Sequence, residues 1–284
     1  MALARLGDLR ALPTLLTALD SDNDTWRAVQ VAAHLRLATA ELVPRLSRLL
    51  ADADFSGQWS DMSAGALISA LAELGDSAAV SVLVHAVIAA VEHEQGHTAA
   101  SALKALASVG LRAASALHAI RPLADAQNVN VRAAATATVW ELERDPEQAV
   151  PRLEALLDTA CSHDAADTLG RIGSPARAVL PHLREMMIAG YEWTRVHAAA
   201  ALWDIAGEAE VEPVVQTLLT AWEANDATSN HVLVCLNRMG PAVAPALPRI
   251  QEELARSRRS GRFASMSNDE ELQRACRAIL IRLV

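Results

Sequence analysis

Apolar and polar positions alternate along this chain with the spacing of amphipathic helices. Large and small apolar residues recur at i, i+3, i+4 and i+7, which predicts helices buried over most of their circumference. A first recurring feature is an apolar residue or a glutamate before a proline, followed by a leucine- or valine-rich run. Because proline is tolerated in the first turn of a helix, each match predicts the start of one helix, called helix A. The matches are Leu12-Pro13, Val43-Pro44, Val150-Pro151, Leu180-Pro181, Glu212-Pro213 and Leu247-Pro248.

A second recurring feature follows each helix A. It is an alanine-rich stretch that ends in an apolar residue plus glycine or a substitute, and glycine just past a helix is a common left-handed terminator. Each stretch therefore predicts a second helix, called helix B. Its terminal markers are Ala38, Gly75, Gly110, Glu143, Gly173, Ala206 and Gly240, which advance by 37, 35, 33, 30, 33 and 34 residues. The repeat predicts an all-α, right-handed α-solenoid of about eight antiparallel helical pairs.

The markers divide the chain into one continuous solenoid over residues 1–284. We expect the segment Met1–Gly7 to be an N-terminal cap or the remnant of a preceding repeat. The segment Arg256–Asn268 is interpreted as a solvated connector inside the last pair, since a run of like charges usually is one. The predicted repeats are 8–38, 41–75, 77–110, 113–143, 146–173, 176–206, 209–240 and 243–284.

An arginine shares one phase in three of the B helices. Arg27, Arg132 and Arg195 each follow a polar turn and precede an alanine-rich run. With the repeat length and the glycine markers, these residues make the chain resemble HEAT repeats, in particular the phycobilisome-lyase HEAT-like subclass. The resemblance implies an α-solenoid whose B helices line a concave face. It implies no single activity, because the family includes scaffolds, transport adaptors, bilin lyases, a DNA glycosylase branch and an iron hydroxylase.

Counting back from each marker indicates which side chains the B helices expose. The position four residues before the marker is apolar in six repeats of seven and is predicted to be core. The positions nine, six and two residues before it form one stripe, spaced i, i+3, i+7, and are predicted to face the concave surface. This stripe is mostly small in repeats one to four and becomes polar and charged in repeats five to seven.

The polar part of the stripe is the candidate binding site. Two indoles at its border, Trp140 and Trp203, flank Gly170 in the neighbouring repeat, which predicts a ring-walled notch beside a polar cluster. Trp26, Trp59 and Trp222 lie near turns between helices and are interpreted as structural. The alternative for the whole stripe is a structural ladder of charges between repeats. The predicted binding residues are Trp140, Asp164, Asp167, Arg171, Trp193, His197, Trp203, Asp204, His231 and Arg238.

Composition narrows the classes of partner. The chain is 52% hydrophobic but only 3% aromatic, which agrees with close-packed alanine-rich helices. The formal net charge of −9 disfavours nucleic acid as a partner. The three cysteines are odd in number and widely spaced, which favours a reducing, cytoplasmic environment. No stretch of the sequence is long and apolar enough to predict a membrane span.

Three motifs that suggest chemistry are weak. The segment His93-Glu94-Gln95-Gly96-His97 matches the H-E-x-x-H pattern of zinc proteases, but the repeat phase places it at a turn, where two histidines cannot share one helix face. The iron hydroxylase of the HEAT family has several His-Glu pairs and this chain has one. Ser162, His163 and Asp164 are consecutive and cannot form a relay, although His163 and Asp167 could pair at i, i+4.

Asp164, His197 and His231 share one position in successive repeats. Two neighbours could hold a metal ion, but three would span about twice the helix-packing distance of roughly 10 Å. We therefore predict no metal ion and no cofactor.

These observations predict a scaffold that binds a protein or peptide on the concave face of repeats four to seven. The alternative is a small-molecule enzyme or lyase-like protein that uses the tryptophan-flanked notch and the His/Asp/Arg cluster. The resemblance to a family that includes bilin lyases keeps this alternative open.

Overall fold

A computed structural model describes residues 2–21, 24–56, 60–256 and 266–283, with the side chains of 60–63 and 266 left aside. Throughout this part of the chain the regular structure is helical and contains no strand. The helices contact one another as two compact units, Met1–Asp145 and Pro146–Val284. The single continuous solenoid over 1–284 stays a prediction. No helix in the described ranges combines the length and the apolar character that crossing a bilayer requires.

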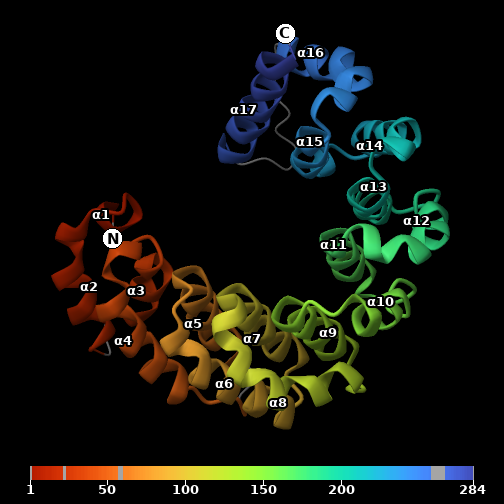
Figure 1. Cartoon of the computed structure of the whole chain (residues 1–284). Helices are drawn as coiled ribbons and strands as arrows, with labels where there is room; N and C mark the ends of the chain where they lie inside the picture. The colour runs from red at the N-terminus through yellow and green to blue at the C-terminus, as the bar shows by residue number, and fades with distance from the viewer. Residues whose placement is uncertain (1, 22–23, 57–59, 257–265, 284) are drawn as a thin grey trace. The chain divides into compact units, whose positions relative to one another are not determined.

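In the first unit, A and B helices alternate along the chain (Figure 1). The B helices pack in series, with α7 between α5 and α9. The A helices are α2 (Leu12–Leu19), α4 (Thr39–Ala51), α6 (Val80–Glu92) and α8 (Leu117–Ile120). The B helices are α1 (Ala2–Arg5), α3 (Thr25–Ala32), α5 (Ser60–Leu74), α7 (Gly96–Val109) and α9 (Val129–Glu143).

The second unit repeats the same alternation. Its B helices also pack in series, because α13 contacts both α11 and α15, and α15 contacts α17. The A helices are α10 (Pro146–Glu154), α12 (Leu180–Met186), α14 (Val211–Ala224) and α16 (Leu247–Ala255). The B helices are α11 (Ser162–Ile172), α13 (Glu192–Ala206), α15 (Ser229–Arg238) and α17 (Met266–Leu283). The prediction of an all-α solenoid built from helical pairs is confirmed.

Short 3-10 helices connect many of these elements. They are η1 (Leu9–Ala11), η2 (Arg36–Ala38), η3 (Ser77–Ala79), η4 (Gly110–Ala116), η5 (Arg121–Asp125), η6 (Ser174–Val179), η7 (Gly207–Glu210), η8 (Asp226–Thr228) and η9 (Gly240–Ala246). Six glycines that follow B helices have positive φ, which glycine adopts without steric cost. In repeat four the residue with positive φ is Arg144 (φ 56°), one residue after the predicted marker Glu143. In repeat six the residue with positive φ is Gly207, one residue after the predicted marker Ala206.

The proline marker is less exact than predicted. Pro13, Pro181 and Pro248 stand in the first two positions of α2, α12 and α16. Pro44 and Pro151 instead lie inside α4 and α10, which begin five residues earlier, at Thr39 and Pro146. A proline near the start of a helix removes one backbone hydrogen bond of the first turns, and these two helices tolerate that loss.

In two of the three B helices, the shared arginine binds the turn before its own helix, whereas Arg195 lies 3.8 Å from Glu192, the first residue of α13. Nη1 of Arg132 donates to the carbonyl oxygens of Ala126 and Gln127, at 2.7 and 3.2 Å. Arg27 contacts Asp24 at 3.1 Å in the corresponding turn of the first repeat. Carbonyl or carboxylate groups of the connecting turn are thereby satisfied by the helix that follows.

The predicted core positions are buried in most repeats. Leu71, Leu106, Leu169, Leu202 and Leu236 have no exposed surface, whereas His34 in the first repeat is exposed. The A helices complete the core with leucines such as Leu83 and Leu218, which are also fully buried. Trp222 is 1% exposed with the Arg249 guanidinium 4.1 Å from its ring centre, in agreement with a structural role. Trp26 is 44% exposed, and Trp59 and most of the predicted connector (257–265) lie outside the described residues.

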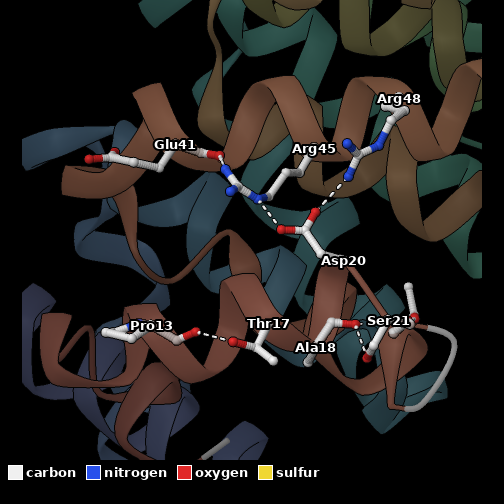
Figure 2. A network of polar contacts seen from close by, with 9 residues as sticks. Pro13, Thr17, Ala18, Asp20, Ser21, Glu41, Arg45 and Arg48 are labelled. Carbon is white, nitrogen blue, oxygen red and sulfur yellow. Dashed lines mark hydrogen bonds and ion pairs between the residues drawn. The ribbon is translucent and has the colours of Figure 1, made fainter.

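Ion pairs link A helices of neighbouring repeats. At the end of α2, the carboxylate of Asp20 accepts from Nε of Arg45 at 2.9 Å and from Nη2 of Arg48 at 2.6 Å (Figure 2). Both arginines belong to α4, one turn apart. The pair of guanidinium groups lowers the pKa of Asp20 below its usual value of 3.8.

Candidate functional site

The candidate residues of the second unit lie on three successive B helices. Asp164, Asp167 and Arg171 belong to α11, and His231 and Arg238 belong to α15. The helix between them, α13, contains Trp193, His197, Trp203 and Asp204. The tenth candidate, Trp140, is on α9 in the first unit, where it is 6% exposed and has the Arg144 guanidinium 5.3 Å from its ring centre.

Asp167, His197 and His231 form the centre of the site. Each offers one oxygen or nitrogen atom suited to a metal ion, and these atoms all lie within 4.8 Å of one another. Nδ1 of His197 and Oδ1 of Asp167 are hydrogen-bonded at 2.7 Å. The expected i, i+4 pair of His163 with Asp167 is not formed, because Asp167 turns to the next helix and His163 Nε2 lies 3.0 Å from Thr194 Oγ1.

Three imidazoles lie in contact across the three helices. The ring centre of His197 is 4.6 Å from that of His163, on which it stacks at 10°, and 4.6 Å from that of His231, to which it is tilted by 51°. Tyr191 also stacks on His163, with ring centres 6.1 Å apart, and Trp193 lies edge-on to His231 at 6.0 Å. Together these five residues are called the ring row.

Burial and the neighbouring imidazole disfavour the charged forms of His163 and His231. Burial lowers the pKa of both His163 and His231, and the neighbouring His197 lowers each further by charge repulsion. The carboxylate of Asp167 acts in the opposite direction on both pKa values but does not reverse the shift.

A second polar group lies further along the same helices. Oδ2 of Asp204 accepts from Nη1 of Arg238 at 2.8 Å, which joins α13 to α15 and realises one step of the predicted charge ladder. Burial raises the pKa of Asp204 despite this arginine. Nη2 of Arg238 also lies 3.7 Å from Sγ of Cys235, whose burial raises the pKa of that thiol to about 11. On α11, Arg171 donates to Thr168 Oγ1 at 3.0 Å.

The predicted notch at Gly170 is filled by the neighbouring helix. A Cβ at Gly170 would lie 3.1 Å from Oδ2 of Asp204 and 3.3 Å from Cα of Ala201. Gly170 is itself buried, so its missing side chain permits close packing of α11 against α13. Trp203 remains half-buried on α13, but no open notch exists beside this glycine.

Two cavities elsewhere are lined by none of the candidate residues. One of about 410 Å³ in the second unit is lined by Pro146, Glu147, Val150, Pro151 and Pro175. Another of about 470 Å³ in the first unit adjoins Glu94, Gly96 and Asn128.

The H-E-x-x-H segment spans a turn, as the repeat phase indicates. His93 terminates α6, Glu94 adopts φ 57°, and Gln95 precedes the first residue of α7. His93 and His97 are both exposed; His93 follows the last residue of α6, whereas His97 lies in α7. This segment lacks the continuous helix that the zinc-protease motif requires.

Sequence reasoning left His163 and Tyr191 outside the candidate site. His163 precedes the stripe by one residue and Tyr191 precedes α13, so neither shares the phase used to select candidates. A search for aromatic side chains at the starts of adjacent B helices would have found both.

Comparison with known proteins supports the repeat type. A family model described as PBS lyase HEAT-like repeat matches residues 1–21, which confirms the predicted resemblance for that segment. No curated protein matches the chain significantly. Among solved structures, human deoxyhypusine hydroxylase in complex with glycerol aligns over 100% of this chain and 99% of its own, with 16% identity and a TM-score of 0.42. A similarity of that extent supports no inference about activity.

Proposed function

We propose that this protein is a scaffold that binds a peptide segment of a partner protein on the B helices of its second unit. The observation that supports the proposal is the ring row, in which Tyr191, His163, His197, His231 and Trp193 contact one another across α11, α13 and α15. Tyrosine and tryptophan are the residues that most often dominate binding energies, because a rigid ring gives a large contact area at a small entropic cost.

The charges around the ring row favour a basic peptide. Asp164 is exposed, the Asp167 side chain is 42% exposed, and Glu192 adjoins Tyr191. Tyr191 is 57% exposed, so its ring face is accessible to a guanidinium or ammonium group. The net charge of −9 attracts a positively charged partner over a longer range.

The test is selection of peptides from a random display library on the full chain, followed by affinity measurement with purified peptides. We expect selected peptides to contain arginine or lysine, and Trp193→Ala and Tyr191→Ala each to weaken binding about tenfold or more, as loss of a dominant aromatic contact does. The matched control is Trp26→Ala, which removes an exposed indole from α3 in the first unit. Helix content by circular dichroism would verify that each variant is folded.

Two results would contradict the proposal. One is that no peptide is enriched above a control protein. The other is that the selected peptides bind the two ring-row variants as tightly as the wild type while Trp26→Ala weakens them.

The alternative of a small-molecule enzyme or lyase-like protein lacks the notch on which it depended, since Asp204 and Ala201 occupy the space beside Gly170. Partner binding therefore remains the function that the surface of α11, α13 and α15 supports best.

A further inference from the structure

Three consecutive B helices each direct one metal-ligand side chain to a common point. Asp167 comes from α11, His197 from α13 and His231 from α15. Their ligand atoms lie within 4.8 Å of one another, and no other group of three or more such residues meets this condition in the part of the chain that the structure describes.

We propose that Asp167, His197 and His231 bind one divalent transition-metal ion of the zinc or cobalt type. Two imidazole nitrogens and one carboxylate oxygen are a ligand set that Zn²⁺ and its first-row neighbours accept. This inference goes beyond the proposed peptide binding, because a metal ion can bind here whether or not a peptide does. It departs from the expectation of no metal site drawn from the sequence.

The distances suit a single ion after small side-chain rotations. Zinc–ligand bonds of about 2.0–2.1 Å place ligand atoms roughly 3.3 Å apart in a tetrahedral site. The Asp167 and His197 atoms are already 2.7 Å apart in their hydrogen bond, and the ion would take the place of the proton that they share. His231 completes the set from the next helix, its ring centre 4.6 Å from that of His197.

The supporting helices hold the ligands in place and leave an entrance. Val196 and Ala198, on either side of His197, are fully buried, so the backbone of this ligand is fixed by the core. The His197 side chain is 12% exposed and that of Asp167 is 42% exposed, which opens the site on the α11 side. Three protein ligands leave at least one coordination position for water or for a group of the partner.

A His–Asp pair elsewhere in the same unit is a natural control. Nε2 of His182 lies 3.2 Å from Oδ1 of Asp158, so the pair has the residue types of the proposed site. It belongs to no group of three metal-ligand residues among those that the structure describes. If a His–Asp pair alone were enough to bind metal, changes at His182 and at His197 would weaken metal binding alike. The proposal requires that only changes at the site of Asp167, His197 and His231 weaken it.

The first measurement is titration of the full, tag-free chain with Co²⁺ alone after treatment with a chelator, followed by visible absorption, with Zn²⁺ competition. We expect one equivalent of Co²⁺ per chain, d–d absorption bands, and displacement by Zn²⁺. Asp167→Asn, which preserves shape, and His231→Ala should each weaken binding at least tenfold, whereas His182→Ala should leave stoichiometry and affinity unchanged.

A second measurement requires no change to the ligands. Trp193 lies 6.2 Å from His197 and 6.0 Å from His231, so bound Co²⁺ should quench its fluorescence, and Trp193→Phe should remove most of the quenching. X-ray absorption of the zinc-loaded wild type should show two imidazoles and otherwise oxygen ligands.

The proposal is overturned if the chain binds no Co²⁺ or Zn²⁺ in the micromolar range, or if binding persists in both Asp167→Asn and His231→Ala. It is also overturned if His182→Ala abolishes metal binding. The same holds if X-ray absorption of the zinc-loaded protein shows fewer than two imidazole ligands. Because no peptide is used, any of these results leaves the peptide-binding proposal intact.

Discussion

Gly96 opens α7 inside the segment that resembles a zinc-protease motif, and its missing side chain has a structural cause. A Cβ at this position would overlap the side-chain amide of Asn128. Oδ1 of Asn128 in turn accepts from the backbone N–H groups of Asn130 and Val131, at 3.0 and 3.3 Å, and so caps α9. The missing Cβ of Gly96 therefore leaves space for the side chain of Asn128, which caps α9 in the next repeat. This packing explains the glycine without any metal chemistry.

Replacement of Gly96 by alanine should therefore destabilise the protein. The new methyl group must displace Asn128, and loss of a helix cap costs about 1 kcal/mol. Urea unfolding of the full chain would measure the difference. Gly65→Ala is the matched control, because Gly65 lies within α5 with nothing within 4 Å of its added Cβ, and should stabilise by about 0.5–1 kcal/mol.

The two glycine variants separate packing from helix propensity. A Gly96→Ala protein at least as stable as the wild type would contradict the packing account. In an Asn128→Ala background, where the cap is already absent, the same change at Gly96 should no longer be destabilising.

At the scale of elements, ion pairs join each of several helices to the equivalent helix of the next repeat. Asp20 terminates α2 and binds Arg45 and Arg48 of α4 (Figure 2). Among the B helices, Asp204 of α13 binds Arg238 of α15 in the same manner. Such links depend on the repeat stacking, because their partners are 25 to 34 residues apart in sequence.

The Asp20 link should make stability depend on pH in a defined direction. Its pKa is lowered in the folded protein, so the stabilisation by ionised Asp20 is fully present above about pH 4, the pKa of an unfolded aspartate, and is lost as the pH falls through the folded value. Asp20→Asn should therefore lower the melting temperature at pH 7, and the difference from wild type should shrink towards pH 3.

Thermal unfolding of the two proteins at several pH values is the measurement. Asp52→Asn, a change at the corresponding C-terminal cap of α4, is the control and should show a smaller difference at pH 7. A melting-temperature difference for Asp20→Asn that stays constant or grows between pH 7 and pH 3 would contradict the role given to the two arginines.

At the scale of the whole molecule, contacts concentrate within Met1–Asp145 and within Pro146–Val284. Helices in repeat proteins contact chiefly their neighbours, so stability is close to a sum of local terms. The candidate ligands Asp167, His197 and His231 all belong to the second unit, and its stability is the one that a bound ion would raise.

Destabilisation should accordingly remain within the unit that is changed. Leu83 in α6 and Leu218 in α14 are both fully buried, and truncation to alanine should cost about 2–5 kcal/mol in either case. Hydrogen exchange followed by mass spectrometry should show faster exchange in the first unit for Leu83→Ala and in the second for Leu218→Ala. Equal acceleration along the entire chain in both variants would indicate one cooperative unit instead.

The sequence by itself determined the repeat of helical pairs and most of the core positions, with the exposed His34 as an exception. This was possible because helix periodicity, glycine terminators and repeat length are local properties that recur in each pair. The charged stripe is found in the same way, and it includes Asp167, His197 and His231.

Only the tertiary structure decided which of these residues meet. Asp164 and His231 share a repeat position, yet Asp167, one turn further along α11, is the residue that reaches His197. The direction of each side chain and the closeness of helix packing depend on neighbours from other repeats, and Asp204 fills the space beside Gly170 for that reason. Repeat phase specifies which face a residue occupies, whereas contacts between repeats decide what that face can bind.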